Sequence, residues 1–336
     1  MTDRNYEPRN WDEYINQEPA KSIVKRALEA SQRRGEPLDH VLIHGPSGLG
    51  KSAMAKIIAG GNLRVVYGQN YLPRVSQESR KEKPPMLPLT EESRLLLGDY
   101  QFEQLRRRHE YYDARSADTP PSYLFIDEIH TVPAPIQETL LEALDKHTEA
   151  QTVIAATTRP DLLITPLRNR FVIEVRVDFY SEDSLTRILV NMAQAMDIRV
   201  QYDGLRLIAS RSRGVPREAK NLLKRVRDFG DHLTLKDIRN ALLSLGVDHL
   251  GLKQDERAYM MSLANDYGGG PTAIATLSSR LSVARETLIT VTEQYLLRAG
   301  LVEITGQGRQ LTAKGRTYVA QVAQCSSASQ YSSAVH

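Results

Sequence analysis

The residues with the clearest chemistry lie in one glycine-rich segment, residues 41–52, which reads Val-Leu-Ile-His-Gly-Pro-Ser-Gly-Leu-Gly-Lys-Ser. Apolar residues enter it in the pattern of a strand, and a helix pattern begins near Lys51. The order from Gly45 to Ser52 fits G-x-x-x-x-G-K-[ST], in which backbone N–H groups surround phosphates, the lysine neutralises their charge and the hydroxyl binds Mg²⁺. The helix N-terminus adds its positive dipole end. We therefore predict a nucleotide-binding site formed by Gly45, Pro46, Ser47, Gly48, Leu49, Gly50, Lys51, Ser52 and Ala53.

A second segment, residues 123–130, is a short apolar strand pattern that ends in two adjacent carboxylates, Asp127 and Glu128. Adjacent residues of a strand point to opposite sides, so the two carboxylates can have separate roles. With Ser52 as the other metal residue, Asp127 can support the Mg²⁺ through its hydration shell, while Glu128 can orient and deprotonate the water that attacks the γ-phosphate. Without the glycine-rich segment, the same pair is equally typical of an ordinary strand end. With it, we expect nucleotide hydrolysis.

Further polar residues follow the next apolar segments. The strand pattern over residues 152–158 ends in two threonines, whose hydroxyls can reach a γ-phosphate, although threonine is also common in strands for its shape alone. Arg168 and Arg170 precede the next strand pattern, where an arginine can serve a phosphate bound by a neighbouring subunit. Arg217 begins a helix pattern, where its charge opposes the helix dipole, and a phosphate partner would explain it.

Composition places the chain among ordinary soluble proteins. It has 336 residues, 41% of them hydrophobic and 25% charged, and a net charge of +3 that argues neither for nor against nucleic acid. The single cysteine, Cys325, excludes a disulfide framework within one chain and suits a reducing cytosol. No apolar run approaches the roughly 18 residues of a membrane span, and the first ten residues are polar. We expect a cytoplasmic protein without a membrane partner.

The order of patterns predicts an α/β domain followed by helical parts. Helix patterns over residues 19–34, 53–59 and 136–146 alternate with strand patterns, the first of which suggest a βαβ unit. Ser181 is expected to cap the first helix of a helical domain. From residue 251, three helix patterns, a hairpin near residues 301–311 and a closing helix from Ala313 predict a winged helix, which usually binds DNA; a small protein-interaction module is the alternative. Residues 72–121 look inserted, and the Ser-rich residues after 324 are expected to be disordered.

Taken together and in this order, the motifs resemble the RuvB family, the Holliday-junction motors among the AAA+ ATPases. The similarity runs nearly end to end, through residues 12–18, 38–51, 125–130, 155–159, 166–171, 211–217, 222–229, 245–251 and 267–271. It implies an α/β fold in which an AAA+ P-loop ATPase domain, a helical lid and a winged-helix domain follow one another. We place these domains at residues 1–180, 181–250 and 251–324, with an insertion at 72–121 and a disordered tail at 325–336.

The resemblance also implies roles and partners. Matching positions make Thr158 the sensor-1 residue, Arg170 the arginine finger that reaches a neighbour's ATP, and Arg217, which follows Pro216, the sensor-2 arginine of the lid; Arg168 is the less favoured finger. Positions that would hold the adenine are Tyr14, Ile15 and Tyr180, where apolar walls suit a flat base. The family's cofactors are ATP and Mg²⁺, and its assembly is a homo-oligomeric ring, for which we expect a hexamer.

This chain departs from the family's pattern in three segments. The family carries a long hairpin before the sensor strand that docks onto the partner RuvA, whereas only residues 145–151 stand there in this chain. The segment over residues 72–121 is longer than its counterpart and shares no clear motif with it. The wing keeps a single arginine, Arg309, as a predicted DNA contact, so DNA affinity from the wing should be weaker and less salt-dependent than in the family.

We therefore expect a Mg²⁺-dependent ATPase ring, resembling RuvB, that translocates or remodels double-stranded DNA such as branched recombination junctions. The missing hairpin argues against docking to RuvA and for another loading partner. One alternative is a nucleotide-switched assembly or adaptor protein that controls a DNA recombination or transposition partner without translocation. Another is a winged-helix transcription factor with an ATPase regulatory domain.

Overall fold

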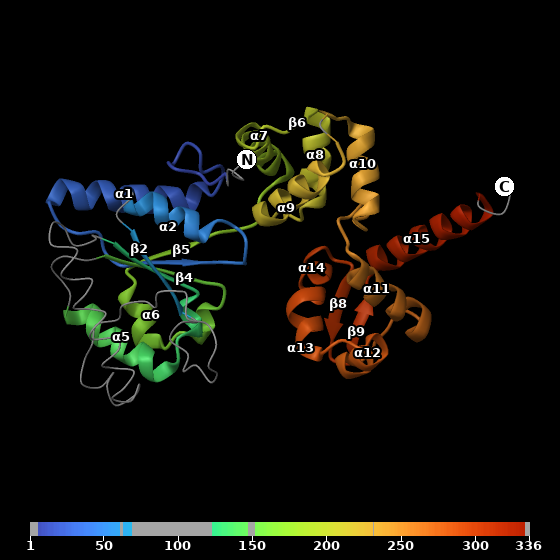
Figure 1. Cartoon of the computed structure of the whole chain (residues 1–336). Helices are drawn as coiled ribbons and strands as arrows, with labels where there is room; N and C mark the ends of the chain where they lie inside the picture. Colours follow the sequence, from blue (N-terminus) through green and yellow to red (C-terminus); the bar gives the residue numbers. More distant parts are fainter. Residues whose placement is uncertain (1–5, 61–62, 69–122, 147–151, 231, 333–336) are drawn as a thin grey trace, which may run out of the picture. The chain divides into compact units, whose positions relative to one another are not determined.

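The computed structural model describes residues 6–60, 63–68, 123–146, 152–230 and 232–332, and Figure 1 labels most of their helices and several of their strands. The chain divides into two compact units, the first formed by Met1–Ile198 with Gly214–Asn221 and the second by Arg199–Arg213 with Leu222–His336. The predicted insertion at residues 72–121 lies outside the described residues. No helix in the described ranges is long and apolar enough to cross a membrane.

A five-stranded parallel sheet forms the centre of the first unit, in the order β2-β3-β4-β1-β5. The strands are β1 (Val41–His44), β2 (Leu63–Tyr67), β3 (Tyr123–Asp127), β4 (Thr152–Thr157) and β5 (Ile173–Arg176). Val41 of β1 pairs with Ile154 on one side and with Ile173 on the other. Strands β1, β3 and β4 lie inside the sheet and are almost wholly buried, which accounts for their continuous apolar sequences.

Helices cover both faces of this sheet (Figure 1). On one face lie α1 (Glu18–Arg34) and α2 (Lys51–Ala59), and on the other lie α5 (Ala134–Lys146) and α6 (Thr165–Arg170). The short helices η2 (Ile129–Thr131) and η3 (Pro160–Leu162) follow β3 and β4. Leu140 and Leu167 pack with Ile126 in a core beneath the sheet. The helix α7 (Glu182–Ala195) begins as predicted at Ser181, whose hydroxyl accepts the Ser184 N–H.

The strand order decides which chain segments meet. We expected a βαβ unit from β1, α2 and β2, but β4 and β3 lie between the two strands. The carboxyl ends of β1, β4 and β3 are therefore neighbours at one edge of the sheet, where α/β proteins bind their ligands. The predicted residues that would contact phosphate, metal or the attacking water lie at the ends of these three strands: the glycine-rich segment follows β1, Asp127 and Glu128 lie at the end of β3, and Thr158 follows β4.

The second unit contains most of the predicted lid and the predicted winged helix. Its first elements are β6 (Arg199–Val200), α8 (Tyr202–Arg211), β7 (His232–Leu233) and α10 (Leu235–Ser244), while the boundary between the units falls within α9 (Pro216–Arg227). The elements that follow are α11 (Gln254–Tyr267), α12 (Ile274–Leu281), α13 (Arg285–Thr287), the π-helical η4 (Leu288–Thr292), α14 (Glu293–Arg298), β8 (Val302–Thr305), β9 (Gly308–Leu311) and α15 (Ala313–Ser332). The antiparallel β8–β9 hairpin follows three helical segments, α11, α12 and the continuous run of α13, η4 and α14, and this order confirms the winged-helix pattern.

The prediction of a disordered tail from residue 325 is wrong as far as residue 332, because α15 continues to Ser332. Residues 316–332 contain neither glycine nor proline, so no residue stops the helix once Tyr318 and Val319 have fixed its first turns in the core. The prediction of disorder rested on the serine-rich composition. Serine is nevertheless only on the order of 0.5 kcal/mol less favourable in a helix than alanine, so the composition alone does not prevent a helix. Residues 333–336 lie outside the described ranges.

Candidate nucleotide-binding and hydrolysis site

The glycine-rich segment forms a tight loop between β1 and α2. Gly48 has a φ of +81°, and a Cβ there would lie 2.9 Å from the Cβ of Arg217 and 2.9 Å from a methyl group of Val215. A Cβ at Gly45, whose φ is +144°, would overlap the carbonyl oxygen of Val177. Only glycine allows both the backbone conformation and this close packing. The loop therefore has the compact, glycine-dependent form that a phosphate cradle requires.

Lys51 is held at the base of this loop. It is the first residue of α2, is 6% exposed, and its Nζ donates to the carbonyl oxygens of Gly45 at 2.9 Å and Pro46 at 3.0 Å. Burial lowers the pKa of Lys51, and the carboxylates of Glu128 and Asp127 oppose that shift. The ammonium group thus lies in a poorly solvated position where phosphate charge would be favourable.

Ser52 and Asp127 provide an oxygen pair beside Lys51. The Ser52 hydroxyl, on α2, donates to Oδ2 of Asp127, the last residue of β3, at 3.0 Å. Hydroxyl and carboxylate oxygens are the ligands that Mg²⁺ prefers. Within the described residues, no group of three or more His, Cys, Asp or Glu side chains could hold a metal. The Ser52 and Asp127 oxygens fit Mg²⁺, which usually takes one or two protein ligands together with waters and phosphate oxygens.

Glu128 leaves the sheet by a different route from the one predicted. The expectation that strand alternation would separate it from Asp127 is wrong, because β3 ends at Asp127 and Glu128 has a φ of +51°. This left-handed residue turns the chain, and Oε2 of its carboxylate accepts the Thr158 N–H and the Thr158 hydroxyl, each at 3.2 Å. The predicted base and the predicted sensor-1 residue are therefore in direct contact, because β3 and β4 are neighbours.

A residue that the sequence did not single out completes this group. His130, in η2, has its Nδ1 3.3 Å from Oε2 of Glu128 and 3.0 Å from the hydroxyl oxygen of Thr157. Burial lowers the pKa of His130, with Glu128 opposing the shift. The only signal in the sequence was its place three residues after Asp127, and a lone histidine after an apolar run predicts no contact.

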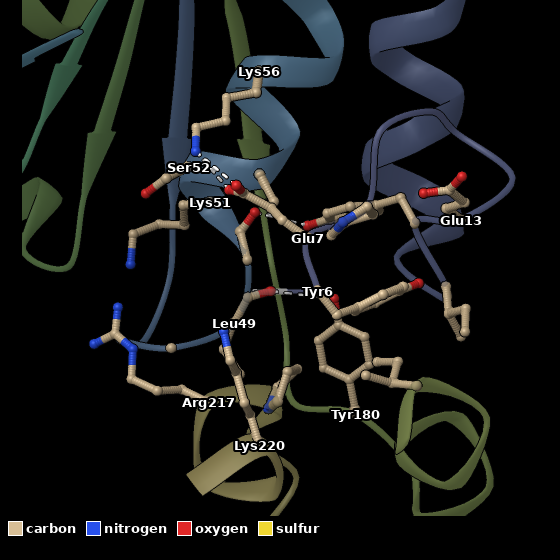
Figure 2. Close-up of a pocket in the computed structure, with 18 of the residues that line it drawn as sticks. Tyr6, Glu7, Glu13, Leu49, Lys51, Ser52, Lys56, Tyr180, Arg217 and Lys220 are labelled. Carbon is tan, nitrogen blue, oxygen red and sulfur yellow. Dashed lines mark hydrogen bonds and ion pairs between the residues drawn. The ribbon is translucent and has the colours of Figure 1, made fainter. Parts of the chain in front are cut away.

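A cavity of about 390 Å³ extends from the loop toward the N-terminal segment (Figure 2). Tyr14, which is 2% exposed, donates its hydroxyl to the carbonyl of Gly50 at 3.3 Å, and the Tyr180 hydroxyl donates to the carbonyl of Leu49 at 3.2 Å. The cavity lining includes the predicted nucleotide-binding residues Tyr14, Ile15, Ser47, Gly48, Leu49, Gly50, Lys51, Ser52, Ala53, Tyr180, Pro216 and Arg217, together with Asp127 and Glu128. Sequence reasoning missed other lining residues, namely Tyr6, Glu7, Pro8, Glu13, Lys56, Ile188, Met192 and Lys220.

The predicted arginines differ in position. Arg217 donates from its guanidinium to the Ser47 hydroxyl at 3.0 Å, and its backbone N–H donates to the carbonyl of Gly48 at 3.3 Å. This contact with the loop gives a reason for a cation at the start of α9. Arg170 ends α6, is exposed, and is not among the residues that line the cavity, whereas Arg168 forms an ion pair with Glu174 at 2.7 Å. A role for Arg170 in a neighbouring subunit stays a prediction.

Arg309 has a partner within its own unit. Its Nε donates to Oε1 of Glu293 at 3.0 Å, and Glu293 is 1% exposed. The same carboxylate oxygen accepts the Tyr259 hydroxyl at 2.6 Å. The side chain that we expected at the DNA surface therefore also balances a buried charge, and the DNA contact stays a prediction.

Comparison with known proteins agrees with this geometry. Residues 41–179 match the AAA family, the ATPases associated with various cellular activities. Residues 180–252 match the RuvB AAA lid domain, and residues 249–320 match the RuvB C-terminal winged helix domain.

Relatives similar to the whole chain carry the same name. The chain is 35% identical to the Holliday junction branch migration complex subunit RuvB of Paracoccus denitrificans, over 93% of this chain and 89% of that protein. It is also 35% identical to RuvB of Rubrobacter xylanophilus, over 91% of this chain and 84% of that protein. Among solved structures, the Thermotoga maritima RuvB Holliday junction branch migration motor is similar at a TM-score of 0.73 and 33% identity, over 93% of this chain and 97% of that one. The phosphate loop, the lid and the winged helix therefore identify the chain as a member of the RuvB family of AAA ATPases.

Proposed function

We propose that this protein hydrolyses ATP and uses the hydrolysis to move or remodel branched double-stranded DNA. The observation that carries the proposal is the convergence at one edge of the sheet of Lys51, the Ser52–Asp127 pair and the Glu128–Thr158 pair. These groups supply phosphate charge, metal ligands and a base, which are the parts that phosphoryl transfer to water requires. The curated relatives are named for Holliday junction branch migration, which supports branched DNA as the target.

Binding would divide between the two ends of the cavity. The loop N–H groups and Lys51 would hold the phosphates, and Arg217, which already contacts Ser47, would add a second cation there. Tyr14 and Tyr180 would provide an apolar wall for the base, because their rings are buried and their hydroxyls are satisfied by the loop carbonyls. The resemblance to the family favours adenine as that base.

Hydrolysis would depend on Glu128. Its carboxylate would accept a proton from the attacking water, while Thr158 holds one of its oxygens in place. Ser52 and Asp127 would hold Mg²⁺, which when bound supplies positive charge to the phosphate oxygens. Lys51 would stay charged near the phosphates because their negative charge offsets its desolvation.

The arginine finger and the ring belong to the same proposal. Arg170 lies outside its own cavity, so its charge would reach ATP only in a neighbouring subunit. An isolated subunit would then hydrolyse ATP slowly, and a closed ring, for which we propose six subunits, would hydrolyse it fast. The short segment at residues 145–151 leaves no room for the family's long hairpin, so we propose a loading partner other than RuvA.

Two substitutions test the chemistry. Lys51→Ala should abolish both ATP binding and hydrolysis, because it removes the buried cation at the loop. Arg170→Ala should keep ATP binding within about twofold of wild type and lower kcat of the assembled protein by roughly 10³-fold, the scale of an arginine finger. Lys236→Ala, an exposed change on α10, is the control and should alter neither.

Mixing the two variants separates action in trans from action in cis. A Lys51→Ala subunit keeps its Arg170 and can complete the site of an Arg170→Ala neighbour. The mixture should therefore recover measurable ATPase activity that neither variant has alone. If mixing at assembly concentrations recovers nothing, Arg170 does not act on a neighbour.

DNA movement needs a separate assay. ATP-dependent displacement of a labelled strand from a synthetic four-way junction should occur with wild type and fail with Lys51→Ala. The comparisons give no support to the alternative of an adaptor that switches without translocating. Steady hydrolysis without any strand displacement, on junctions with and without added loading factors, would nevertheless favour that alternative.

A further inference from the structure

The imidazole of His130 connects the ends of two neighbouring strands. Its side chain is 15% exposed, and its Nδ1 lies between Oε2 of Glu128 at 3.3 Å and the Thr157 hydroxyl oxygen at 3.0 Å. Thr157, the last residue of β4, is fully buried, while Glu128 directly follows β3. The ring is thus placed against the predicted base on one side and a fixed point of the sheet on the other.

Proton counting limits how these groups can bond. The Thr157 oxygen already accepts the Arg159 N–H at 3.0 Å, and a hydroxyl has one proton to donate and two lone pairs. Neutral histidine carries its proton on either Nδ1 or Nε2. With the proton on Nδ1, the single N–H lies between two acceptors, the Thr157 hydroxyl oxygen at 3.0 Å and Oε2 of Glu128 at 3.3 Å, and is shared between them. With the proton on Nε2, Nδ1 could accept the Thr157 hydroxyl proton, but it would also face a second acceptor, Oε2 of Glu128, at 3.3 Å, which is unfavourable. Contact with the carboxylate therefore favours the Nδ1–H form of the neutral ring.

The contacts on Glu128 are concentrated on one oxygen. Oε2 accepts the Thr158 N–H and hydroxyl and lies within reach of Nδ1 of His130. A glutamate side chain rotates freely about its last bond unless its oxygens are held. The two donors come from the end of β4, and the imidazole lies against the same oxygen from η2, so the carboxylate is contacted from two directions.

We propose that His130 is a positioning residue for Glu128, whose Nδ1–H holds one carboxylate oxygen so that the other faces the attacking water. The proposal rests on the ATP hydrolysis proposed above. His130 does not itself contact the nucleotide or the water. Its loss should slow the chemical step and leave nucleotide binding unchanged, because the loop and Lys51 do not depend on it.

The test compares three substitutions in the full chain by ATPase kinetics. His130→Leu removes the donor at similar volume, and His130→Gln places an amide where Nε2 lies; both should lower kcat by about 100-fold, the cost of misplacing a catalytic group by about an ångström. His130→Asn places an amide N–H close to the position of Nδ1 and should recover kcat to within about threefold of wild type. KM for ATP and the Kd for ADP should stay within about twofold in all three.

Each outcome separates this inference from the proposed function. A wild-type protein without ATPase activity would defeat the proposed function itself. An active wild type with an equally active His130→Leu would defeat the positioning role alone. The inference would also fail if His130→Asn were as slow as His130→Leu, or if ADP binding fell in parallel with kcat, because either result indicates a structural role. His249→Leu, at an exposed histidine stacked on Tyr318 in the second unit, is the matched control and should leave kcat unchanged.

Discussion

The ion pair between Arg309 and Glu293 has consequences for how DNA binding by the wing can be measured. Glu293 is almost fully buried, and besides Arg309 its carboxylate accepts the hydroxyl of Tyr259. Burial raises the pKa of Tyr259, and the hydrogen bond to Glu293 raises it further, so this hydroxyl remains a proton donor at any ordinary pH. Removing the arginine would leave a buried carboxylate with only a neutral partner, which is costly.

Arg309→Ala should therefore destabilise the winged-helix part by roughly 3–5 kcal/mol, and DNA affinity would fall whether or not Arg309 contacts phosphate. The double substitution Arg309→Ala with Glu293→Gln removes the buried charge as well and should recover most of that stability in urea unfolding. DNA affinity of the double variant, measured at several salt concentrations, then isolates the direct contact. A phosphate contact by Arg309 predicts weaker binding and a salt slope smaller by about one. Wild-type affinity and slope in the double variant would exclude it.

The same residues show what sequence can and cannot provide. The segment from Gly45 to Ser52 was predictable because its function depends on backbone conformation over contiguous positions, which glycines reveal. Asp127 was predictable because an apolar strand led directly to it. The partners of Glu128 and Arg309, by contrast, are set by the tertiary fold. His130 and Glu293 carry no local pattern that distinguishes them from other histidines and glutamates, so neither contact could be read from the chain.

At the scale of elements, the end of β2 packs against the turn that carries Glu128. Gly68, the first residue after β2, is buried, and a Cβ there would lie 2.6 Å from the Thr131 hydroxyl oxygen and overlap the carbonyl oxygen of Glu128. Gly68 does not have a positive φ, so glycine is required there because a side chain would not fit, and not because of backbone strain. The strand at the edge of the sheet thus sets the position of a backbone group two strands away from the phosphate loop.

Gly68→Ala should displace the backbone at Glu128 and lower kcat for ATP hydrolysis by roughly 10- to 100-fold, since small misplacements of a catalytic group are expensive. Stability should fall by about 1–3 kcal/mol, the usual cost of overpacking. Steady-state kinetics and urea unfolding measure the two effects. Gly306→Ala is the control, because nothing lies within 4 Å of a Cβ at that position. Unchanged kcat in Gly68→Ala would show that the Glu128 turn does not depend on this contact.

The order of elements was only partly predictable for a related reason. Alternating strand and helix patterns identify an α/β domain, but they do not say that β4 and β3 lie between β1 and β2. That arrangement depends on which strands pair, and pairing between parallel strands is non-local. The prediction for the segment that forms α15 failed in the opposite way. There, local composition predicted disorder, whereas the continuing helix depends on its first turns being fixed in a core many residues away.

At the scale of the whole chain, one arginine ties the end of a lid segment to the winged helix within the second unit. Arg213 donates to both oxygens of Glu256 and to the carbonyl of Gly251, and its guanidinium lies 4.4 Å from the centre of the Tyr295 ring. The side chains of Arg213 and Glu256 are only 11% and 7% exposed. These contacts join residues from α11 and α14 to the segment that follows α8. We therefore expect this lid segment and the winged helix to move together, although the predicted division into separate lid and winged-helix domains stays a prediction.

Arg213→Leu should destabilise the second unit by roughly 3–5 kcal/mol, because it leaves the Glu256 carboxylate buried without its partner. Hydrogen exchange is the suitable measurement, since amides of α11 and α14 should exchange faster while those of β1, β3 and β4 keep their protection. Arg280→Ala is the control: its ion pair with Asp266 has side chains 57% and 28% exposed, and its loss should leave stability and amide protection close to those of wild type. Equal protection in Arg213→Leu and wild type would mean that the packed helices, rather than this arginine, join the two parts.

Arg170 is exposed at the end of α6 and lies outside the cavity of its own chain. This position has a genetic consequence. If each subunit supplies an arginine finger to the next, one polypeptide contributes to two catalytic sites. Each complete site is then built from two subunits. An allele that encodes Arg170→Ala would then yield subunits that join normal rings and silence a neighbour's intact site. In a cell that also carries the normal gene, such an allele would be dominant, and its severity would rise steeply with its share of the subunit pool.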